Sequence, residues 1–173
     1  MSMLALLRCR RGAAAAEMAL VTPLLVLMLA GGVEVGYYFY AEHRLVEGVR
    51  DAARYAGRQS FNEYAACSGS PSSTLVANAR LLAAKGSLNS GDPDKLWGWG
   101  ETGESFTITM SCTTTATSSL GTETLSGIYK GRADGAPVVT VHATLPHQSV
   151  FAAFGFRLPL ELNATQQATV MGV

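Results

Sequence analysis

The sequence predicts an α+β protein in which a long N-terminal transmembrane helix continues into an amphipathic stem and packs on a small antiparallel sheet. Three observations lead to this fold class. An apolar run begins at Met18, apolar residues recur at helical spacing after it, and later segments alternate apolar with polar residues. A chain of 173 residues has room for one such membrane segment and one small folded domain. Its 13 basic and 13 acidic residues leave no basic excess for neutralising phosphates, so we expect no nucleic-acid partner.

A short basic leader precedes the apolar run. Arg8, Arg10 and Arg11 lie just before Gly12, and no acidic residue separates them from the run. Basic residues beside a membrane segment favour the cytoplasmic side, so we expect a cytoplasmic N-terminus and a C-terminal domain beyond the membrane. Arginines also follow the span, so counting alone does not decide the orientation; they are Arg44, Arg50, Arg54 and Arg58.

The apolar run reaches the length of a membrane span when it is extended to an aromatic cluster. Residues 18–33 supply about 16 apolar or small residues, whereas extension to Tyr40 gives roughly 23, and a span needs about 20. Aromatic residues such as those at 37–40 are favoured at the headgroup level. We therefore predict a transmembrane helix over residues 13–40. A secretory signal peptide cut after Ala30 is the main alternative, although it places Met28 where a small residue is expected.

Four residues of the predicted span stand out. Glu17 lies at its start, and a carboxylate there is costly to bury, so we expect it to have a dedicated partner or task. Pro23 lacks an amide hydrogen and should kink or loosen the helix. Gly32 and Gly36 form a small-xxx-small pair that lets another helix approach closely. Ordinary tolerance of glycine and proline in membrane helices explains the last three residues equally well. Glu34 is expected near an interface, in reach of water.

An amphipathic stem is predicted over residues 41–58. Its apolar residues recur at three- and four-residue steps, at Leu45, Val49, Ala52 and Ala56. On the other face the spacing lets Glu47 pair with Arg50, and Asp51 with Arg54. An unbroken helix over residues 13–58 would be roughly 69 Å long.

The remaining residues, 59–173, are predicted to form an extracytoplasmic α+β head. Ser72 or Ser73 is placed to cap a short helix that Gly86 would end. Alternation of apolar and polar residues then predicts strands over 106–113, 139–145 and 158–164, the last of them continuing less strongly to Val170, with Cys112 facing inward and His142 outward. Such strands suit an antiparallel sheet with one covered face, and the stem and the short helix are its natural cover.

Two cysteines lie in the predicted head. In an oxidising compartment Cys67 and Cys112 can form one disulfide, and closing a loop of roughly 45 residues would stabilise the head by about 4 kcal/mol. Two buried free thiols are the alternative. Trp97 and Trp99 alternate with glycines, and such tryptophans more often cover a small core than form a contact surface.

No motif of catalysis is recognisable. The sequence lacks a G-x-S-x-G elbow, an H-E-x-x-H helix and a phosphate-cradling glycine loop, and its three histidines are scattered. His43 and Glu47 have the spacing of a helical metal pair but no third ligand. We therefore expect no enzyme, no metal site, no cofactor and no small-molecule substrate.

The N-terminal segment, residues 10–57, resembles the N-terminus of TadE-like pilus assembly proteins, which are minor pseudopilins of tight-adherence type IVb pilus systems. It reads RRGAAAAEMALVTPLLVLMLAGGVEVGYYFYAEHRLVEGVRDAARYAG. A weaker similarity lies in residues 138–171. The resemblance implies a pilin-like fold and removal of a leader, residues 1–12, by an inner-membrane prepilin peptidase that cuts between Gly12 and Ala13. Glu17 is then the fifth mature residue.

The same resemblance implies where the protein works and with what. Its expected partners are the prepilin peptidase, other pilin-like subunits, the inner-membrane pilus assembly platform and membrane lipid. The protein would be a single-pass inner-membrane protein with a periplasmic head, able to enter an extracellular pilus. A membrane-anchored or secreted periplasmic binding domain unrelated to pili is the alternative. The native N-terminal residue separates these readings, because a pilin-like subunit starts at Ala13, a secreted protein at Gly31 and a plain anchor at Met1.

Overall fold

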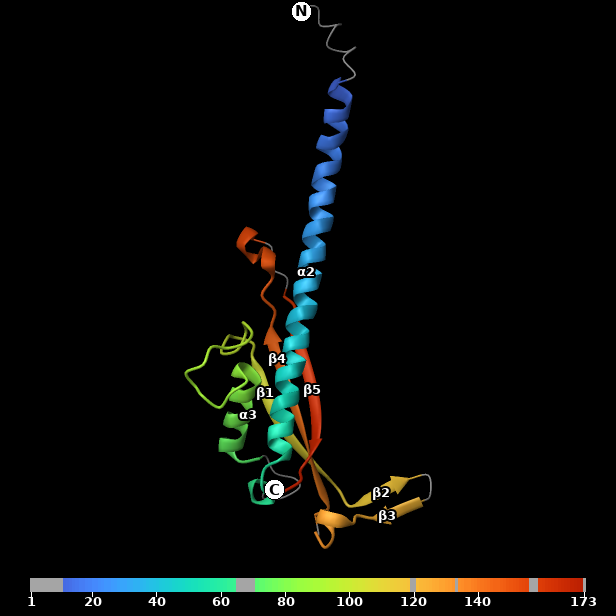
Figure 1. Cartoon of the computed structure of the whole chain (residues 1–173), viewed down its shortest axis with the longest axis vertical. Helices are drawn as coiled ribbons and strands as arrows, with labels where there is room; N and C mark the ends of the chain where they lie inside the picture. The colour runs from blue at the N-terminus through green and yellow to red at the C-terminus, as the bar shows by residue number, and fades with distance from the viewer. Residues whose placement is uncertain (1–10, 65–70, 119–120, 133, 156–158, 173) are drawn as a thin grey trace, which may run out of the picture. The chain divides into compact units, whose positions relative to one another are not determined.

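The computed structural model describes residues 11–64, 71–118, 121–132, 134–155 and 159–172 and confirms the α+β fold class (Figure 1). The chain divides into two compact units, residues 1–38 and residues 39–173. In chain order the elements are α2 (Arg11–Gly57), η1 (Phe61–Glu63), α3 (Ser73–Lys85), β1 (Ser105–Thr113), β2 (Thr115–Ser118), β3 (Gly121–Thr124), η2 (Gly127–Tyr129), β4 (Ala136–Pro146), η3 (Val150–Phe154) and β5 (Glu161–Thr169).

The first unit consists, in its described part, of the N-terminal portion of α2. The helix is continuous through Pro23, although a proline removes one main-chain hydrogen bond. Next to it, the Thr22 hydroxyl donates a hydrogen bond to the Met18 carbonyl one turn back, at 2.6 Å. Among the described residues this is the one helix long and apolar enough to cross a membrane.

The C-terminal portion of α2 forms part of the core of the second unit. The four apolar residues predicted to face inward are buried, each at most 1% exposed: Leu45, Val49, Ala52 and Ala56. Gly48 lies on the same side, where an added Cβ would come within 2.4 Å of the Ala83 carbonyl oxygen. The predicted stem is thus confirmed, and it packs closely enough on α3 that one position has no room for a side chain.

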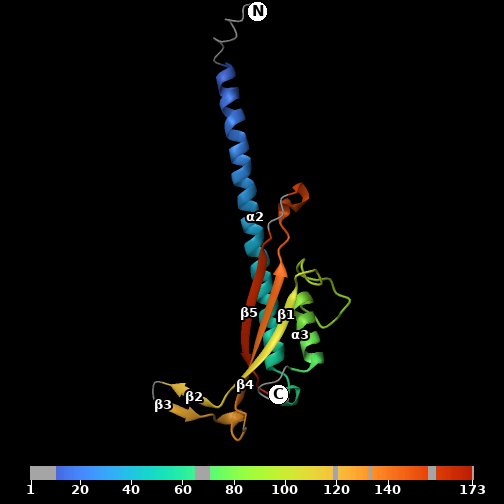
Figure 2. The ribbon, with the colours of Figure 1, turned by 180° about the vertical axis from the view of Figure 1, so that it is seen from behind.

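Three antiparallel strands form the sheet of the second unit, in the order β1-β4-β5. Figures 1 and 2 show the C-terminal part of α2 on one face of this sheet, with α3 beside it. The covered face carries the buried residues Ile108, Val139, Val141, Ala143, Leu145, Leu162 and Ala164. Hydroxyl and amide side chains occupy the other face, as when the Thr144 hydroxyl donates to Asn163 at 2.8 Å. This alternation confirms the expected one-sided sheet.

Helix α3 begins and ends where the sequence predicts. The Ser72 hydroxyl accepts a hydrogen bond from the Leu75 amide, and Gly86 ends the helix in the left-handed conformation, with φ 72°. Tyr64, which follows η1, is buried and its hydroxyl donates to the Ala56 carbonyl. Burial raises the pKa of Tyr64 well above its ordinary range, because the charged phenolate would lose solvation.

Two features of the strands differ from the expectation. The last strand begins at Glu161 rather than at residue 158, which lies outside the described residues, and Leu160 is 40% exposed just after Pro159. A short hairpin of β2 and β3 was not expected, and it forms its own two-stranded sheet. Gly135 directly precedes β4 and lies against the end of β1, because a Cβ added there would lie 2.3 Å from the Thr113 carbonyl oxygen.

Candidate assembly site

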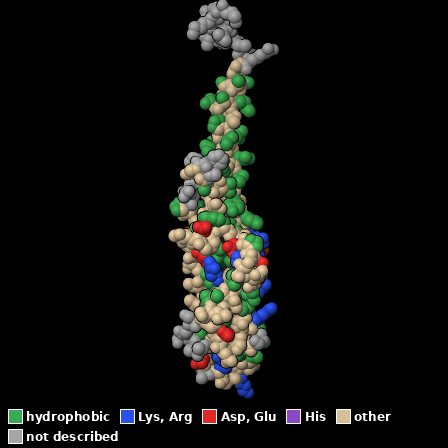
Figure 3. All heavy atoms as spheres, turned by 90° about the vertical axis from the view of Figure 1, so that its left-hand side faces the viewer, with side chains coloured by type: hydrophobic (Ala, Val, Ile, Leu, Met, Phe, Trp, Pro, Cys, Tyr) green, Lys and Arg blue, Asp and Glu red, His purple; other side chains and the backbone are tan. Residues whose placement is uncertain are grey.

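The N-terminal portion of α2 exposes an apolar surface that nothing in its own unit covers. Leu20 is 81% exposed, Leu29 74% and Leu27 70%. Figure 3 shows hydrophobic side chains gathered along this portion. A helix that is apolar on all sides needs lipid or other helices around it. The surface is therefore a candidate site for the membrane and for partner helices.

The two glutamates of this portion have opposite environments. Glu17 is exposed on the helix surface. Glu34 is 8% exposed, so the expectation that it reaches water is wrong. The carboxylate of Glu17 is thus the one that remains available to another molecule.

The small residues singled out in the sequence lie on open helix surface. A Cβ added at Gly32 or Gly36 would meet no atom within 4 Å. Pro23 is exposed as well. Close approach at these positions would have to come from a second chain, and their role in helix packing stays a prediction.

The predicted cleavage point lies at the start of α2. Gly12 and Ala13 are the second and third residues of the helix and both are exposed. Residues 1–10 of the leader lie outside the described residues. Glu17 follows Ala13 by four residues, so the two lie about one helical turn apart on neighbouring positions of one face.

A comparison with known protein families gives a match over most of α2. The family described as TadE-like protein matches residues 12–54, which is 43 of 173 residues. This segment is similar to the TadE-like family, and we call it the TadE-like segment. The match confirms the resemblance drawn from the sequence, and it begins at the predicted cleavage point. The TadE-like segment covers about a quarter of the chain, so the similarity in residues 138–171 stays a prediction. No curated protein and no solved structure matches the chain.

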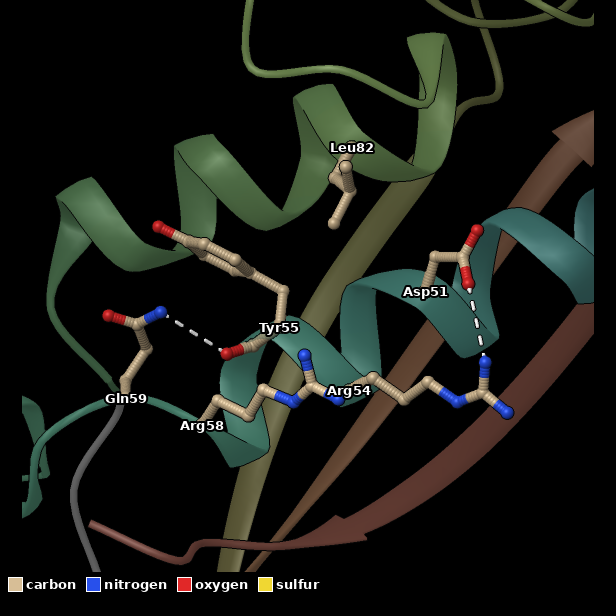
Figure 4. A pocket seen from close by; sticks show the side chains of 6 residues that line it. All are labelled: Asp51, Arg54, Tyr55, Arg58, Gln59 and Leu82. Atoms are coloured by element: carbon tan, nitrogen blue, oxygen red, sulfur yellow. Dashed lines mark hydrogen bonds and ion pairs between the residues drawn. The ribbon is translucent and has the colours of Figure 1, made fainter. Parts of the chain in front are cut away.

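The second unit carries a different kind of surface at the end of the TadE-like segment. A shallow groove of 450 Å³ lies between α2 and α3, and we call it the arginine groove (Figure 4). Its lining residues are Asp51, Arg54, Tyr55, Arg58, Gln59 and Leu82. Figure 4 shows Leu82 of α3 directed toward α2 and the two arginines extended along the outer side of α2. This groove was not predicted from the sequence, although Arg50, Arg54 and Arg58 follow one another at a spacing of four.

Of the two ion pairs predicted on the stem, one forms and the other does not. Asp51 pairs with Arg54 as expected, at 3.8 Å. Glu47 pairs with Arg44 at 3.2 Å and with His43 at 3.5 Å, so the expected Glu47–Arg50 pair is wrong. His43 and Arg44 lie four and three residues before Glu47 and contact its two carboxylate oxygens, so they take the place of Arg50 as its partners.

The tryptophans divide between the two expected roles. Trp99 is 7% exposed and packs beside Phe106, with ring centroids 6.2 Å apart. Trp97 is 45% exposed. Gly98 separates them in a conformation with φ 113°, and an added Cβ there would lie 3.0 Å from the Pro146 carbonyl oxygen. Core coverage is thus confirmed for Trp99 and wrong for Trp97.

The remaining predicted site residues are the cysteines. Cys112 lies in β1 on the half-buried side of the strand, as predicted. Cys67 lies outside the described residues, so the predicted disulfide stays a prediction. Within the described ranges, no group of three or more His, Cys, Asp or Glu side chains lies close enough to hold a metal ion.

Proposed function

We propose that the protein is a structural, non-enzymatic subunit for assembly of a tight-adherence type IVb pilus, in the manner of a minor pseudopilin. The TadE-like match associates the chain with such a pilus system. The observation that carries the proposal is that this match begins at Gly12 and contains, five residues later, the exposed carboxylate of Glu17. Partner subunits and the inner-membrane assembly platform are the partners that this role requires.

In the proposed pathway, prepilin peptidase removes residues 1–12 and leaves Ala13 as the N-terminus. The helix over residues 13–40 holds the protein in the inner membrane, and the head lies in the periplasm. A charged carboxylate within the bilayer costs about 3 kcal/mol or more, and a partner of opposite charge offsets that cost. The new α-amine of Ala13 on a neighbouring subunit supplies that charge. Pairing between Glu17 and this amine would fix the register of neighbouring helices.

The first test is the mass of the native protein. A start at Ala13 in cells that contain the peptidase is the expected result. Retention of Met1 would contradict processing, and a start at Gly31 would show that the apolar run is a signal peptide.

The second test replaces Glu17 by Gln. We expect processing to continue, because the cleavage point is unchanged, and the amount of the subunit that co-purifies with its pilin-like partners to fall at least fivefold. The matched control is Glu42→Gln, which makes the same change on the same helix outside the predicted span. Undiminished co-purification of the Glu17 variant would contradict the assembly role.

A further inference from the structure

The arginine groove carries positive charge that the chain itself leaves largely unused. The Arg54 side chain is 66% exposed, and its contact with Asp51, at 3.8 Å, is near the limit for an ion pair. Arg58 is exposed and makes no ion pair with any residue that the structure describes. The same two arginines also line a second hollow of 370 Å³, together with Gly57, Ala168, Thr169 and Met171. Of the two guanidinium groups, that of Arg58 has no carboxylate partner among the described residues, and that of Arg54 has only the long contact with Asp51.

A segment with matching chemistry lies elsewhere on the same head. We call residues 95–101 the Trp97 loop. Trp97 is 45% exposed, and Glu101 is exposed without an ion pair to any described residue. An aromatic ring and a carboxylate in one loop are suited to a surface with arginines, because a guanidinium stacks on aromatic rings and binds carboxylates. Tyr55 and Leu82 add apolar area to the groove for the ring.

The backbone of the Trp97 loop is held in place. The Lys95 amide donates to the Ala84 carbonyl at 2.8 Å, and the Glu101 amide donates to the Gly98 carbonyl at 3.3 Å. Just beyond the loop, Glu104 accepts two hydrogen bonds of 2.6 Å from Arg80 on α3. These hydrogen bonds raise the pKa of the Arg80 guanidinium. Because the loop is already ordered, binding through it costs little conformational entropy.

The loop is attached to its own head at a level of α2 that precedes Arg58. Ala83 packs against Gly48, and Lys95 bonds to the next residue of α3, so the loop is attached near Gly48. The groove extends along α2 from Asp51 to Gln59. Ten residues separate Gly48 from Arg58, or about 15 Å along the helix axis. A second copy shifted by about this distance along the stem brings its loop to the level of the groove.

A lipid headgroup fits the groove less well than a protein carboxylate. Arg54 follows Tyr40, the end of the predicted span, by 14 residues on a continuous helix, or about 21 Å. Electrostatic attraction to a charged surface is screened within about 8 Å at physiological ionic strength. The observations therefore favour a protein occupant.

We propose that the arginine groove of one copy binds the Trp97 loop of a second copy, with Glu101 pairing with Arg58 and Trp97 lying against Arg54. Each copy carries both surfaces, and the contact joins unlike patches, so it extends from copy to copy rather than closing a pair. This inference rests on the proposed function only in that assembled copies lie side by side. Such a small contact is weak alone and is strengthened when the copies are held in one membrane.

The experiment uses the full-length protein in its membrane, with two differently tagged copies expressed together. A photo-crosslinking residue replaces Gln59 in one copy, and mass spectrometry maps the crosslinked peptide of the other. We expect crosslinks to residues 95–101 of the second copy. Arg58→Glu should lower their yield at least fivefold, as should Glu101→Arg. Combining Arg58→Glu in one copy with Glu101→Arg in the other should restore at least half of the yield.

Arg50→Glu is the matched control, because it reverses an exposed arginine on the same helix outside the groove, and it should leave the yield unchanged. Tryptophan fluorescence of each variant checks that the head is folded. Crosslinks only to lipid or to another protein would overturn the inference, as would loss of yield in the control or failure of the combined variants to restore it. A chain that starts at Ala13 and needs Glu17 for co-purification would still support the proposed function after such a failure.

Discussion

The two portions of α2 contain similar residues in opposite circumstances. Residues 11–38 expose leucines such as Leu27, which is 70% exposed, whereas Leu45, farther along the same helix, is 1% exposed. The second portion finds its partner in the chain's own sheet, and the first has none among the described residues of its unit. Hydrophobic content alone therefore does not tell which part of a helix stabilises the head and which part is left exposed by the chain itself. The size of this difference can be measured by substitutions in the head and in each portion of α2.

The largest expected effect concerns the disulfide predicted for the head alone. If Cys112 pairs with Cys67, then Cys112→Ser should lower the free energy of unfolding of the head by about 4 kcal/mol. Denaturation of the full-length protein in detergent, followed by tryptophan fluorescence, measures this, because both tryptophans lie in the head. The control is Cys9→Ser in the leader, which should have no effect. Two free thiols in the oxidised native protein would refute the pairing.

The direct comparison between the two portions uses the same change in each. Leu45→Ala should lower the free energy of unfolding of the head by about 3 kcal/mol, because it leaves a cavity at a fully packed site. Leu27→Ala should change it by less than about 0.5 kcal/mol, since that side chain is exposed within the chain. The same denaturation experiment serves for both variants. Equal effects would show that both portions of α2 contribute equally to the free energy of unfolding of the head.

A smaller effect is expected when glycines are filled. Gly48→Ala should cost about 1–3 kcal/mol of head stability, because its Cβ would lie 2.4 Å from the Ala83 carbonyl oxygen. Gly32→Ala should leave the head unaffected, since its Cβ meets no atom within 4 Å. If Gly32 serves helix packing, its variant should instead weaken co-purification with partner subunits. A stable Gly48 variant would mean that α2 and α3 can separate at little cost.

The sequence predicted those elements in which periodicity and burial coincide. Val49 and Ala56 follow the helical period, and Val139 and Val141 the strand period, because each faces a single core. The caps of α3 were predictable from Ser72 and Gly86, since capping depends on local geometry.

What the sequence left open depends on contacts between distant segments. The hairpin of β2 and β3 carries hydroxyl residues without apolar alternation, so no period marks it. The division between Trp97 and Trp99 is set by the close approach of Gly98 to Pro146. The arginine groove exists because α3 lies along α2, and no local pattern of residues predicts that packing. The arginines could be read from the sequence, but the position of α3 beside them could not.

A main-chain hydrogen bond joins the residues that follow β5 to the end of α2. The Met171 amide donates to the Gly57 carbonyl at 2.8 Å, and Val170, next to it, is fully buried. The fold of the head is therefore closed by a contact between two segments that lie far apart in the sequence. The apolar side of the stem stays uncovered until β5 has been synthesised and has joined the sheet.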